Sequence, residues 1–316
     1  MKLDPIIPFE PIQTDQIPLG ERWVHQVKWD GVRILSYSDG RETALFNRRK
    51  IERTAHFPEL MSAESYSIAQ SAIFDGEVIA LDESGKPSFH QVMKRDGIRL
   101  LDRVSELRQS VPIFYMIFDL LYLNGQWIID QPFQQRYERL SKVVRENQTV
   151  KRVRYQRDGQ ALFDAIVKQD LEGIVSKDLT STYSIHQKGA AWKKVKNYKD
   201  IIAVVGGVTY RENVVNALIL GLYNQKDQFV CIGYAGTGKL TRQDWQTLTD
   251  HIGPLRRNLC PFSEKPKRSS QAVWLVPRLT VKIQYLGLTT DNLLRQPSIQ
   301  AFVIRPSQEC RLEELI

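Results

Sequence analysis

The chain has 316 residues, of which 42% are hydrophobic and 25% are charged, and this composition excludes a disordered or fibrous protein. The formal net charge of +8 favours a polyanionic partner such as nucleic acid over an acidic one. The three scattered cysteines without a Cys-x-x-Cys pair, and the lack of a signal segment or a long apolar run, predict a cytoplasmic protein with no zinc site and no membrane span.

The first 200 residues mix strand and helix patterns. Four early prolines, Pro5, Pro8, Pro11 and Pro18, favour an extended lead-in. The stretch 23–36 alternates and is rich in β-forming residues, so we expect a strand there, followed by a hairpin turn at 38–40. Further helices are predicted over 59–71, 100–110, 132–147 and 159–169, and further strands over 72–81, 113–123, 172–177 and 191–196.

The composition changes at the polar stretch 197–200, where we place a domain boundary that divides the chain into residues 1–198 and 199–316. Residues 201–221 and 228–234 are β-rich and punctuated by glycine, a helix is expected over 242–252, and strands resume at 272 and 280. This is the pattern of a small β-barrel. The second part carries about half of the net positive charge in little more than a third of the chain, as expected of a nucleic-acid clamp.

The most informative stretch is Lys28-Trp29-Asp30-Gly31-Val32-Arg33. A period of two places Lys28 and Asp30 on one face of the expected strand, and Gly31 marks a place where the backbone passes close to another group. A lysine in this setting could attack a phosphoryl group while Arg33 holds a nucleotide. Taken alone, Lys-x-Asp-Gly is more often an exposed turn.

Five further segments follow this stretch in order: Arg48 with Thr54 and Phe57-Pro58-Glu59-Leu60, then Phe74-Asp75-Gly76-Glu77, Phe118-Asp119-Leu120-Leu121-Tyr122, Glu172-Gly173-Ile174-Val175-Ser176-Lys177 and Trp192-Lys193-Lys194-Val195-Lys196. Together with the Lys28 segment they resemble the motifs of covalent nucleotidyltransferases, and most closely those of bacterial end-joining, LigD-like ATP-dependent DNA ligases. The resemblance covers nearly the whole chain. It implies an α+β fold, in which an adenylation domain with antiparallel sheets and flanking helices precedes an OB-fold barrel.

The resemblance also implies a reaction and a set of site residues. Lys28 would attack the α-phosphate of ATP and carry AMP, assisted by Lys194 and Lys196, and AMP would then pass to the 5′-phosphate of a DNA nick before the 3′-hydroxyl displaces it. Glu172 and Glu77 are the candidates for holding Mg²⁺, with Mn²⁺ as an alternative metal. The nucleotide-binding candidates are Gln26, Val27, Arg33, Arg48, Glu77, Phe118, Lys177 and Arg305.

The chain departs from the family pattern at two positions that bear on function. Gln26 stands where a glutamate usually reads the adenine amino group, so the acceptor is kept but base selectivity is less secure. Arg305 is followed by Pro306-Ser307, whereas the family often has an acidic residue and Asp-Lys after this arginine. Slow self-adenylation is the expected consequence of the second departure.

Partners and rival functions follow from the same resemblance. The expected partner is nicked or broken double-stranded DNA, with Ku and a separate polymerase or nuclease module as further partners of a monomer associated with the bacterial nucleoid. An RNA ligase, a capping-type enzyme or a non-catalytic nucleic-acid-binding protein are the alternatives. Residues 233–239 also fit G-x-x-x-x-G-K, but position 240 is leucine where a P-loop needs a hydroxyl, so we expect a glycine-rich turn.

Overall fold

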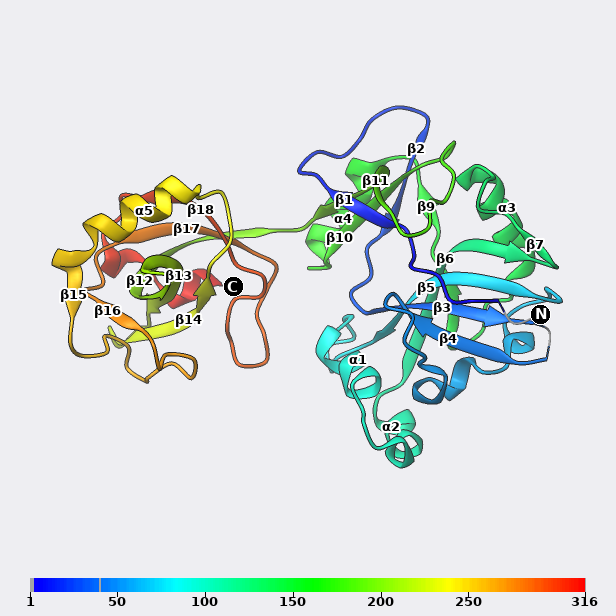
Figure 1. The fold of residues 1–316 in the computed structure, drawn as a ribbon, viewed down its shortest axis with the longest axis horizontal. Coiled ribbons are helices and arrows are strands. Elements are labelled where there is room, and N and C mark those ends of the chain that lie inside the picture. Colours follow the sequence, from blue (N-terminus) through cyan, green and yellow to red (C-terminus); the bar gives the residue numbers. More distant parts are fainter. Residues whose placement is uncertain (1–2, 40, 316) are drawn as a thin grey trace. The chain divides into compact units, whose positions relative to one another are not determined.

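The computed structural model of the chain describes residues 3–39 and 41–315 (Figure 1). The chain folds into two compact units, Met1–Asn197 and Tyr198–Ile316. Within the described residues, no helix combines the length and the apolar character needed to cross a membrane.

Two sheets form the first unit. The first has the strand order β1-β11-β10-β2-β9 and the second the order β4-β3-β5-β6-β7, with β8 paired to β6. The pairings are antiparallel except for β1 with β11 and β6 with β8. The strands are β1 Glu10–Gln13, β2 Trp23–Val27, β3 Val32–Ser38, β4 Thr43–Asn47, β5 Ala72–Ala80, β6 Ile113–Leu123, β7 Gln126–Trp127, β8 Val150–Arg152, β9 Tyr155–Gln156, β10 Gly173–Asp178 and β11 Lys188–Lys196.

Helices flank these sheets: α1 (Phe89–Asp96), α2 (Val104–Ser110), α3 (Phe133–Val143) and α4 (Gly159–Lys168). The apolar stripe of α4 explains its position, because Leu162 and Ile166 are buried against Ile174 of β10. Asp158 caps this helix by accepting a hydrogen bond from the backbone N–H of Ala161. The helices predicted over 100–110, 132–147 and 159–169 correspond to α2, α3 and α4 to within a few residues, so these predictions are confirmed. Helix α1 was not predicted.

The helix expected over 59–71 is wrong. Two short 3₁₀ turns, Pro58–Leu60 and Ala63–Ser65, occupy this region instead. The serines explain the difference, because their hydroxyls compete for backbone groups that a helix would use. The hydroxyl of Ser65, for example, donates to the carbonyl of Ser62 at 2.7 Å.

The single strand expected over 23–36 is also wrong, because the chain changes sheet within it. β2 ends at Val27 in the first sheet and β3 begins at Val32 in the second, so Lys28 lies in the crossover. Gly31 permits this crossover, since a Cβ there would lie 2.2 Å from the carbonyl oxygen of Val78. The expected β3–β4 hairpin is present, although Gly40 of its turn lies outside the described residues.

An aromatic cluster fills the space between the two sheets. Phe9, Tyr183 and Trp192 are buried there with Leu35 and Leu121 from the second sheet. The ring of Trp192 meets that of Phe9 edge to face, with centroids 5.4 Å apart. The N-terminal lead-in is thus part of the core of the first unit, which fixes one side of the space between the sheets.

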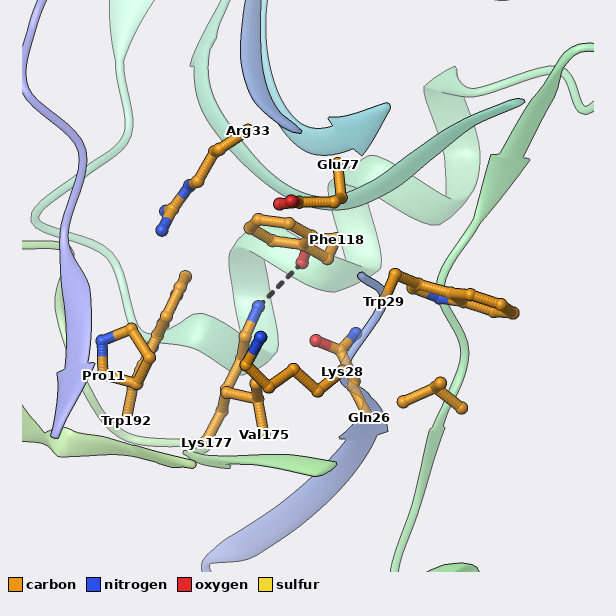
Figure 2. A pocket seen from close by; sticks show the side chains of 11 residues that line it. Pro11, Gln26, Lys28, Trp29, Arg33, Glu77, Phe118, Val175, Lys177 and Trp192 are labelled. Atoms are coloured by element: carbon orange, nitrogen blue, oxygen red, sulfur yellow. Dashed lines mark hydrogen bonds between the residues drawn. The ribbon is translucent and has the colours of Figure 1, made fainter. Parts of the chain in front are cut away.

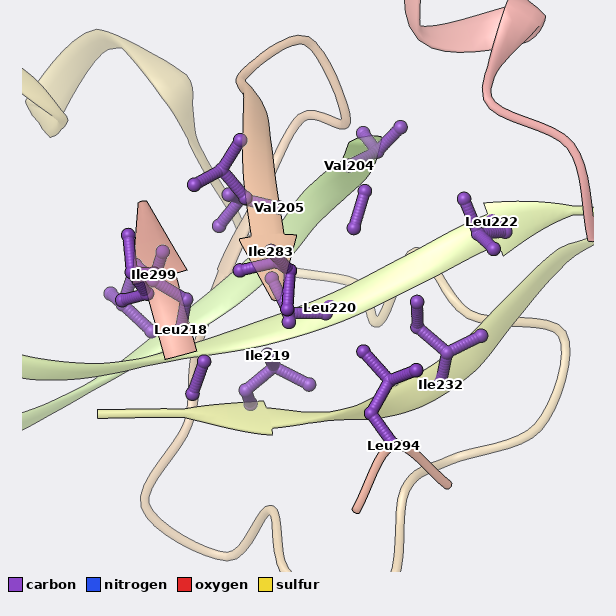
Figure 3. Close-up of a cluster of buried hydrophobic side chains, with 14 of the residues drawn as sticks. Val204, Val205, Leu218, Ile219, Leu220, Leu222, Ile232, Ile283, Leu294 and Ile299 are labelled. Atoms are coloured by element: carbon purple, nitrogen blue, oxygen red, sulfur yellow. The ribbon is translucent and has the colours of Figure 1, made fainter. Parts of the chain in front are cut away.

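The second unit is a barrel-like sheet around a single apolar core (Figure 3). Its strand order is β14-β13-β12-β16-β15, with β17 paired to β12 and β18. α5, whose N-terminus has a Thr241–Asp244 capping box, packs against β13. The elements are β12 Lys199–Arg211, β13 Val214–Tyr223, β14 Phe229–Ala235, α5 Arg242–His251, β15 Arg256–Arg257, β16 Val273–Leu275, β17 Thr280–Tyr285 and β18 Ser298–Val303.

The glycine-rich stretch 233–239 is a packed turn in this unit. β14 runs antiparallel to β13, which differs from the parallel sheet that precedes a P-loop. Gly238 has a positive φ of 149°, and a Cβ there would lie 2.1 Å from the carbonyl oxygen of Ile299. Glycine is therefore required at this position for backbone packing.

Candidate active site

A pocket opens between the two sheets of the first unit, where the chain leaves β2 (Figure 2). The strands β2, β10 and β11 contribute one wall, and β3, β5 and β6 contribute the facing wall. The lining residues are Pro11, Gln26, Val27, Lys28, Trp29, Arg33, Glu77, Phe118, Val175, Lys177 and Trp192. Motif segments that are far apart in the sequence therefore meet in this pocket.

Lys28 is anchored by its backbone and leaves its amine in the pocket. Its N–H donates to the carbonyl of Gly173 at 2.9 Å, which ties the crossover to β10. Its Nζ donates to Oε2 of Glu172 at 2.6 Å, and Nζ of Lys196 lies 3.8 Å from Oε1 of the same carboxylate. The Lys28 side chain is 22% exposed and that of Glu172 7%, so the amine is accessible while its partner is not.

Lys194 lies close enough to Lys28 for their charges to interact. Partial burial is the main cause that lowers the pKa of Lys194, and the positive charges of Lys28 and Lys188 lower it further. Lys194 and Lys196 thus add positive potential beside the Lys28 amine, on the strand that was predicted to carry them.

Lys177 is enclosed by aromatic rings. Its ammonium lies 3.9 Å from the ring centroid of Trp192, 4.4 Å from that of Phe118 and 4.7 Å from that of Phe133, and it donates to the Phe118 carbonyl at 3.2 Å. Burial lowers the pKa of Lys177 to about 7, against a smaller opposing effect of Asp119. An anionic group entering the pocket would stabilise the charged form of this side chain.

Arg33 is held rigidly on the opposite wall. Its guanidinium binds the buried carboxylate of Asp75 through two hydrogen bonds and also donates to the Tyr183 hydroxyl at 3.2 Å. Tyr183 in turn donates to Asp75 at 2.7 Å and accepts the Phe9 N–H at 3.1 Å. The guanidinium also lies over the ring of Phe118, 5.1 Å from its centroid. Its orientation is therefore fixed before any ligand binds.

Glu77 of β5 lines the pocket, and its carboxyl group lies beside the ring of Phe118 in Figure 2. Burial raises the pKa of Glu77 to about 8, while Lys28 and Arg33 lower it and Glu172 raises it further. The described residues contain no cluster of three or more metal-ligating side chains. Glu77 and Glu172 carry carboxyl oxygens, the kind of ligand that Mg²⁺ prefers, and the two groups are close enough for their charges to interact.

Five predicted residues are not among those that line the pocket: Glu172, Lys194, Lys196, Arg48 and Arg305. Glu172 and Lys196 lie beside the Lys28 amine, whereas Arg48 and Arg305 do not. Arg48 is 59% exposed and lies 3.6 Å from a carboxylate oxygen of Glu10. Arg305 belongs to the second unit, where it forms an ion pair of 2.7 Å with Glu314. Their roles in nucleotide binding stay predictions.

Some residues of the site were not predicted. Pro11, Trp29, Val175 and Trp192 line the pocket, and Tyr183 positions Arg33. Trp192 is the first residue of the last motif segment, so its aromatic ring within a motif was a signal in the sequence that it lines the site. Pro11 and Tyr183 reach the site through tertiary contacts that no local pattern announces.

Fold and pocket are those of a nucleotidyltransferase, and comparison with known proteins identifies the class. A family model described as "ATP dependent DNA ligase domain" matches residues 11–196, and one described as "ATP dependent DNA ligase C terminal region" matches residues 211–305. The chain belongs to the ATP-dependent DNA ligase family. The predicted fold class, an adenylation domain followed by an OB-fold domain, is confirmed.

Individual relatives include end-joining proteins. The "Multifunctional non-homologous end joining protein LigD" of Mycolicibacterium smegmatis is 29% identical over 285 residues, which are 88% of this chain and 35% of that protein. A "Probable DNA ligase" of Streptomyces griseus is 30% identical over 275 residues, 83% of this chain and 51% of that protein. The solved ligase domain from M. tuberculosis LigD is 25% identical with a TM-score of 0.53, covering 98% of this chain and 99% of that one.

These relatives confirm the predicted resemblance to LigD-like ligases. The chain spans about a third to a half of the length of the curated relatives that it matches first.

Proposed function

We propose that this chain is an ATP-dependent DNA ligase that forms a covalent adenylate on Lys28, passes AMP to the 5′-phosphate of a nick and joins that end to the 3′-hydroxyl. The observation that carries the proposal is the Lys28 amine, accessible in a pocket and bonded to a buried carboxylate between further lysines. Residues 1–198 would act as the adenylation domain and 199–316 as the OB-fold domain.

The first step needs a neutral amine. The nitrogen of Lys28 forms a bond to the α-phosphorus while the bond to pyrophosphate breaks, and Glu172 at 2.6 Å is the nearest acceptor for the proton that the amine loses. Lys194 and Lys196 would stabilise the negative charge that develops on the phosphate oxygens. Glu172 therefore has two proposed roles, in proton transfer and in metal binding.

The nucleotide would lie between the two walls. The ring of Phe118 would offer a face for adenine, Arg33 and Lys177 would offer positive charge to the ribose and phosphates, and Gln26 and Val27, which also line the pocket, would contact the base. Glu77 and Glu172 would hold Mg²⁺, or Mn²⁺, which when bound spreads the charge of the departing pyrophosphate. Arg48 and Arg305 remain candidates for phosphate contacts made with substrate bound.

End-joining repair in a bacterial cytoplasm is the biological setting that we propose, because LigD proteins are among the relatives. Ku and a polymerase or nuclease module are the proposed partners, and the ligase would work as a monomer on nicked or broken DNA. The excess of positive charge fits the DNA backbone.

The test is sealing of a nicked duplex with a 5′-phosphate, in the presence of ATP and magnesium, by the wild type and by Lys28→Ala. We expect a sealed strand from the wild type, none from Lys28→Ala, and normal sealing from Lys142→Ala, a change at an exposed position of α3. Parallel reactions with GTP, and with RNA at the nick, separate DNA ligation from RNA ligation and capping-type chemistry. A protein that binds the nicked duplex but never seals it would contradict the proposal.

A further inference from the structure

Phe118 is the extra residue of a β-bulge in β6. In the pairing of β6 with β5, Asp119 lies opposite Asp75 and Ile117 lies opposite Gly76, so Phe118 is left out of the register. A bulge bends its strand and changes the direction of a side chain, and bulges are frequent next to active sites. The bulge is therefore the backbone feature that decides where the Phe118 ring points.

The side chains around the bulge show its effect. Ile117 and Leu120 are both buried in the apolar cluster that packs on one face of the second sheet. A regular strand would place these two residues on opposite faces, because they are three positions apart. The residues between them, Phe118 and Asp119, are therefore both turned to the other face. There the ring of Phe118 meets that of Trp192 edge to face, with centroids 6.0 Å apart.

Side chains bind the backbone groups at the bulge. The Phe118 carbonyl accepts a hydrogen bond from Lys177 at 3.2 Å, the bond that is drawn in Figure 2. The backbone N–H of Leu120 donates to the carboxylate of Asp119 at 2.8 Å. Buried backbone groups need hydrogen-bond partners, so both bonds stabilise the bulge. The Asp119 carboxylate is thus part of the structure that holds Phe118.

Arg136 of α3 fixes this carboxylate. Its guanidinium binds Asp119 through two hydrogen bonds of 2.9 Å, and neither side chain is exposed to solvent. Its remaining nitrogen donates to the carbonyls of Gln131 at 2.6 Å and Ser181 at 3.0 Å. A buried pair with this geometry, in which every guanidinium nitrogen has a partner, has a single orientation. Arg136 lies outside the motif segments, and the proposed function gives it no role.

We propose that Arg136 is a positioning residue for the nucleotide: it holds Asp119, which holds the bulge that directs the Phe118 ring into the pocket. The inference rests on the proposed function, in which adenine stacks on this ring. Without the guanidinium, Asp119 loses its partner and the ring loses its fixed direction. ATP then binds more weakly. The chemical step is kept, because Lys28 is held separately, by Gly173 and Glu172.

The experiment measures initial rates of self-adenylation over a range of ATP concentrations for the wild type and Arg136→Lys, which keeps the charge but cannot form both hydrogen bonds to the carboxylate. We expect the ATP concentration for half-maximal rate to rise on the order of tenfold, and the maximal rate to change by less than about threefold. Arg139→Lys, the same change at an exposed position of α3, is the matched control and should leave both values unchanged.

A double-mutant cycle separates positioning from a general loss of stability. Phe118→Leu removes the ring and should itself raise the ATP concentration for half-maximal rate. If Arg136 acts through the ring, adding Arg136→Lys to Phe118→Leu should raise this concentration by less than about twofold more. A general loss of stability would give the full effect again, and that result would overturn the inference. Should Arg136→Lys not fold, Asp119→Asn takes its place in the cycle with the same expected outcome.

The possible failures are separable. If the wild type forms no covalent adenylate, the proposed function fails and this inference fails with it. If the wild type forms the adenylate but Arg136→Lys needs no more ATP than the wild type, or loses maximal rate alone, only the inference is overturned.

Discussion

Lys177 should lower the stability of the folded chain, and replacing it by methionine should raise that stability in a pH-dependent way. Burial lowers the pKa of Lys177 to about 7 in the folded state, whereas an unfolded lysine has a pKa near 10.5. Between these values the unfolded chain binds a proton that the folded chain does not, so this site makes stability rise with pH. Below pH 7 the full cost of burying the charge is present.

The size of the effect follows from the pKa difference. A change from 10.5 to about 7 corresponds to roughly 5 kcal/mol at 1.36 kcal/mol per pH unit. The three aromatic faces around the ammonium offset up to about 1 kcal/mol each. We therefore expect Lys177→Met to raise the free energy of unfolding by about 2 to 5 kcal/mol at pH 6 and by no more than about 1 kcal/mol near pH 10.

The assay is urea titration of the wild type and Lys177→Met at both pH values. Lys188→Met, which changes an exposed lysine on β11, is the matched control and should alter the free energy of unfolding by less than about 0.5 kcal/mol. A loss of stability in Lys177→Met at pH 6, or a gain of equal size at both pH values, would refute the reasoning, because neither result is compatible with an ammonium whose cost of burial exceeds the contribution of its aromatic contacts.

Three further changes test the geometry of the site. Gly31→Ala would place a Cβ 2.2 Å from the Val78 carbonyl oxygen, so self-adenylation should fall at least tenfold; a rate within a factor of two of the wild type would contradict the close approach. Asp75→Ala leaves the Arg33 guanidinium without its buried partner and should lower the free energy of unfolding by about 3 to 5 kcal/mol, measured in urea; a loss below about 1 kcal/mol would contradict it. Burial raises the pKa of Glu77 to about 8, so this carboxyl should lose a proton when ATP and magnesium bind at pH 7, and the net proton exchange is measured by calorimetry in buffers of different ionisation enthalpy; Glu77→Gln should lower the number of protons released by close to one, and an unchanged number would exclude this carboxyl.

Local patterns in the sequence were sufficient for most of the elements, and the resemblance to a known family named most of the residues that line the pocket. Alternation and length identified β5 and β6, which together carry Glu77 and Phe118. Most of the motif segments lie on strands. A strand places alternate residues on one face, so alternate side chains of a segment point toward the same side. Lys194 and Lys196 share β11 in this way.

What the sequence did not predict depends on contacts between distant segments. The crossover at Lys28 continues a β-rich pattern, and only the packing of Gly31 against β5 shows that the chain changes sheet there. Pro11 enters the pocket because β1 pairs with β11, an association that its own sequence does not specify. The orientation of the Gln26 amide likewise depends on a distant segment, because its nitrogen donates to the carbonyl of Val153, more than a hundred residues later in the chain.

The central claim is that Lys28 becomes covalently bonded to AMP. Mass spectrometry of the intact protein and of its peptides, after incubation with ATP and magnesium, measures this directly. The account predicts one added adenylyl group per chain, located on the peptide that contains Lys28, labile in acid and absent from Lys28→Ala. An adenylyl group on another residue, or its persistence in Lys28→Ala, would contradict the account.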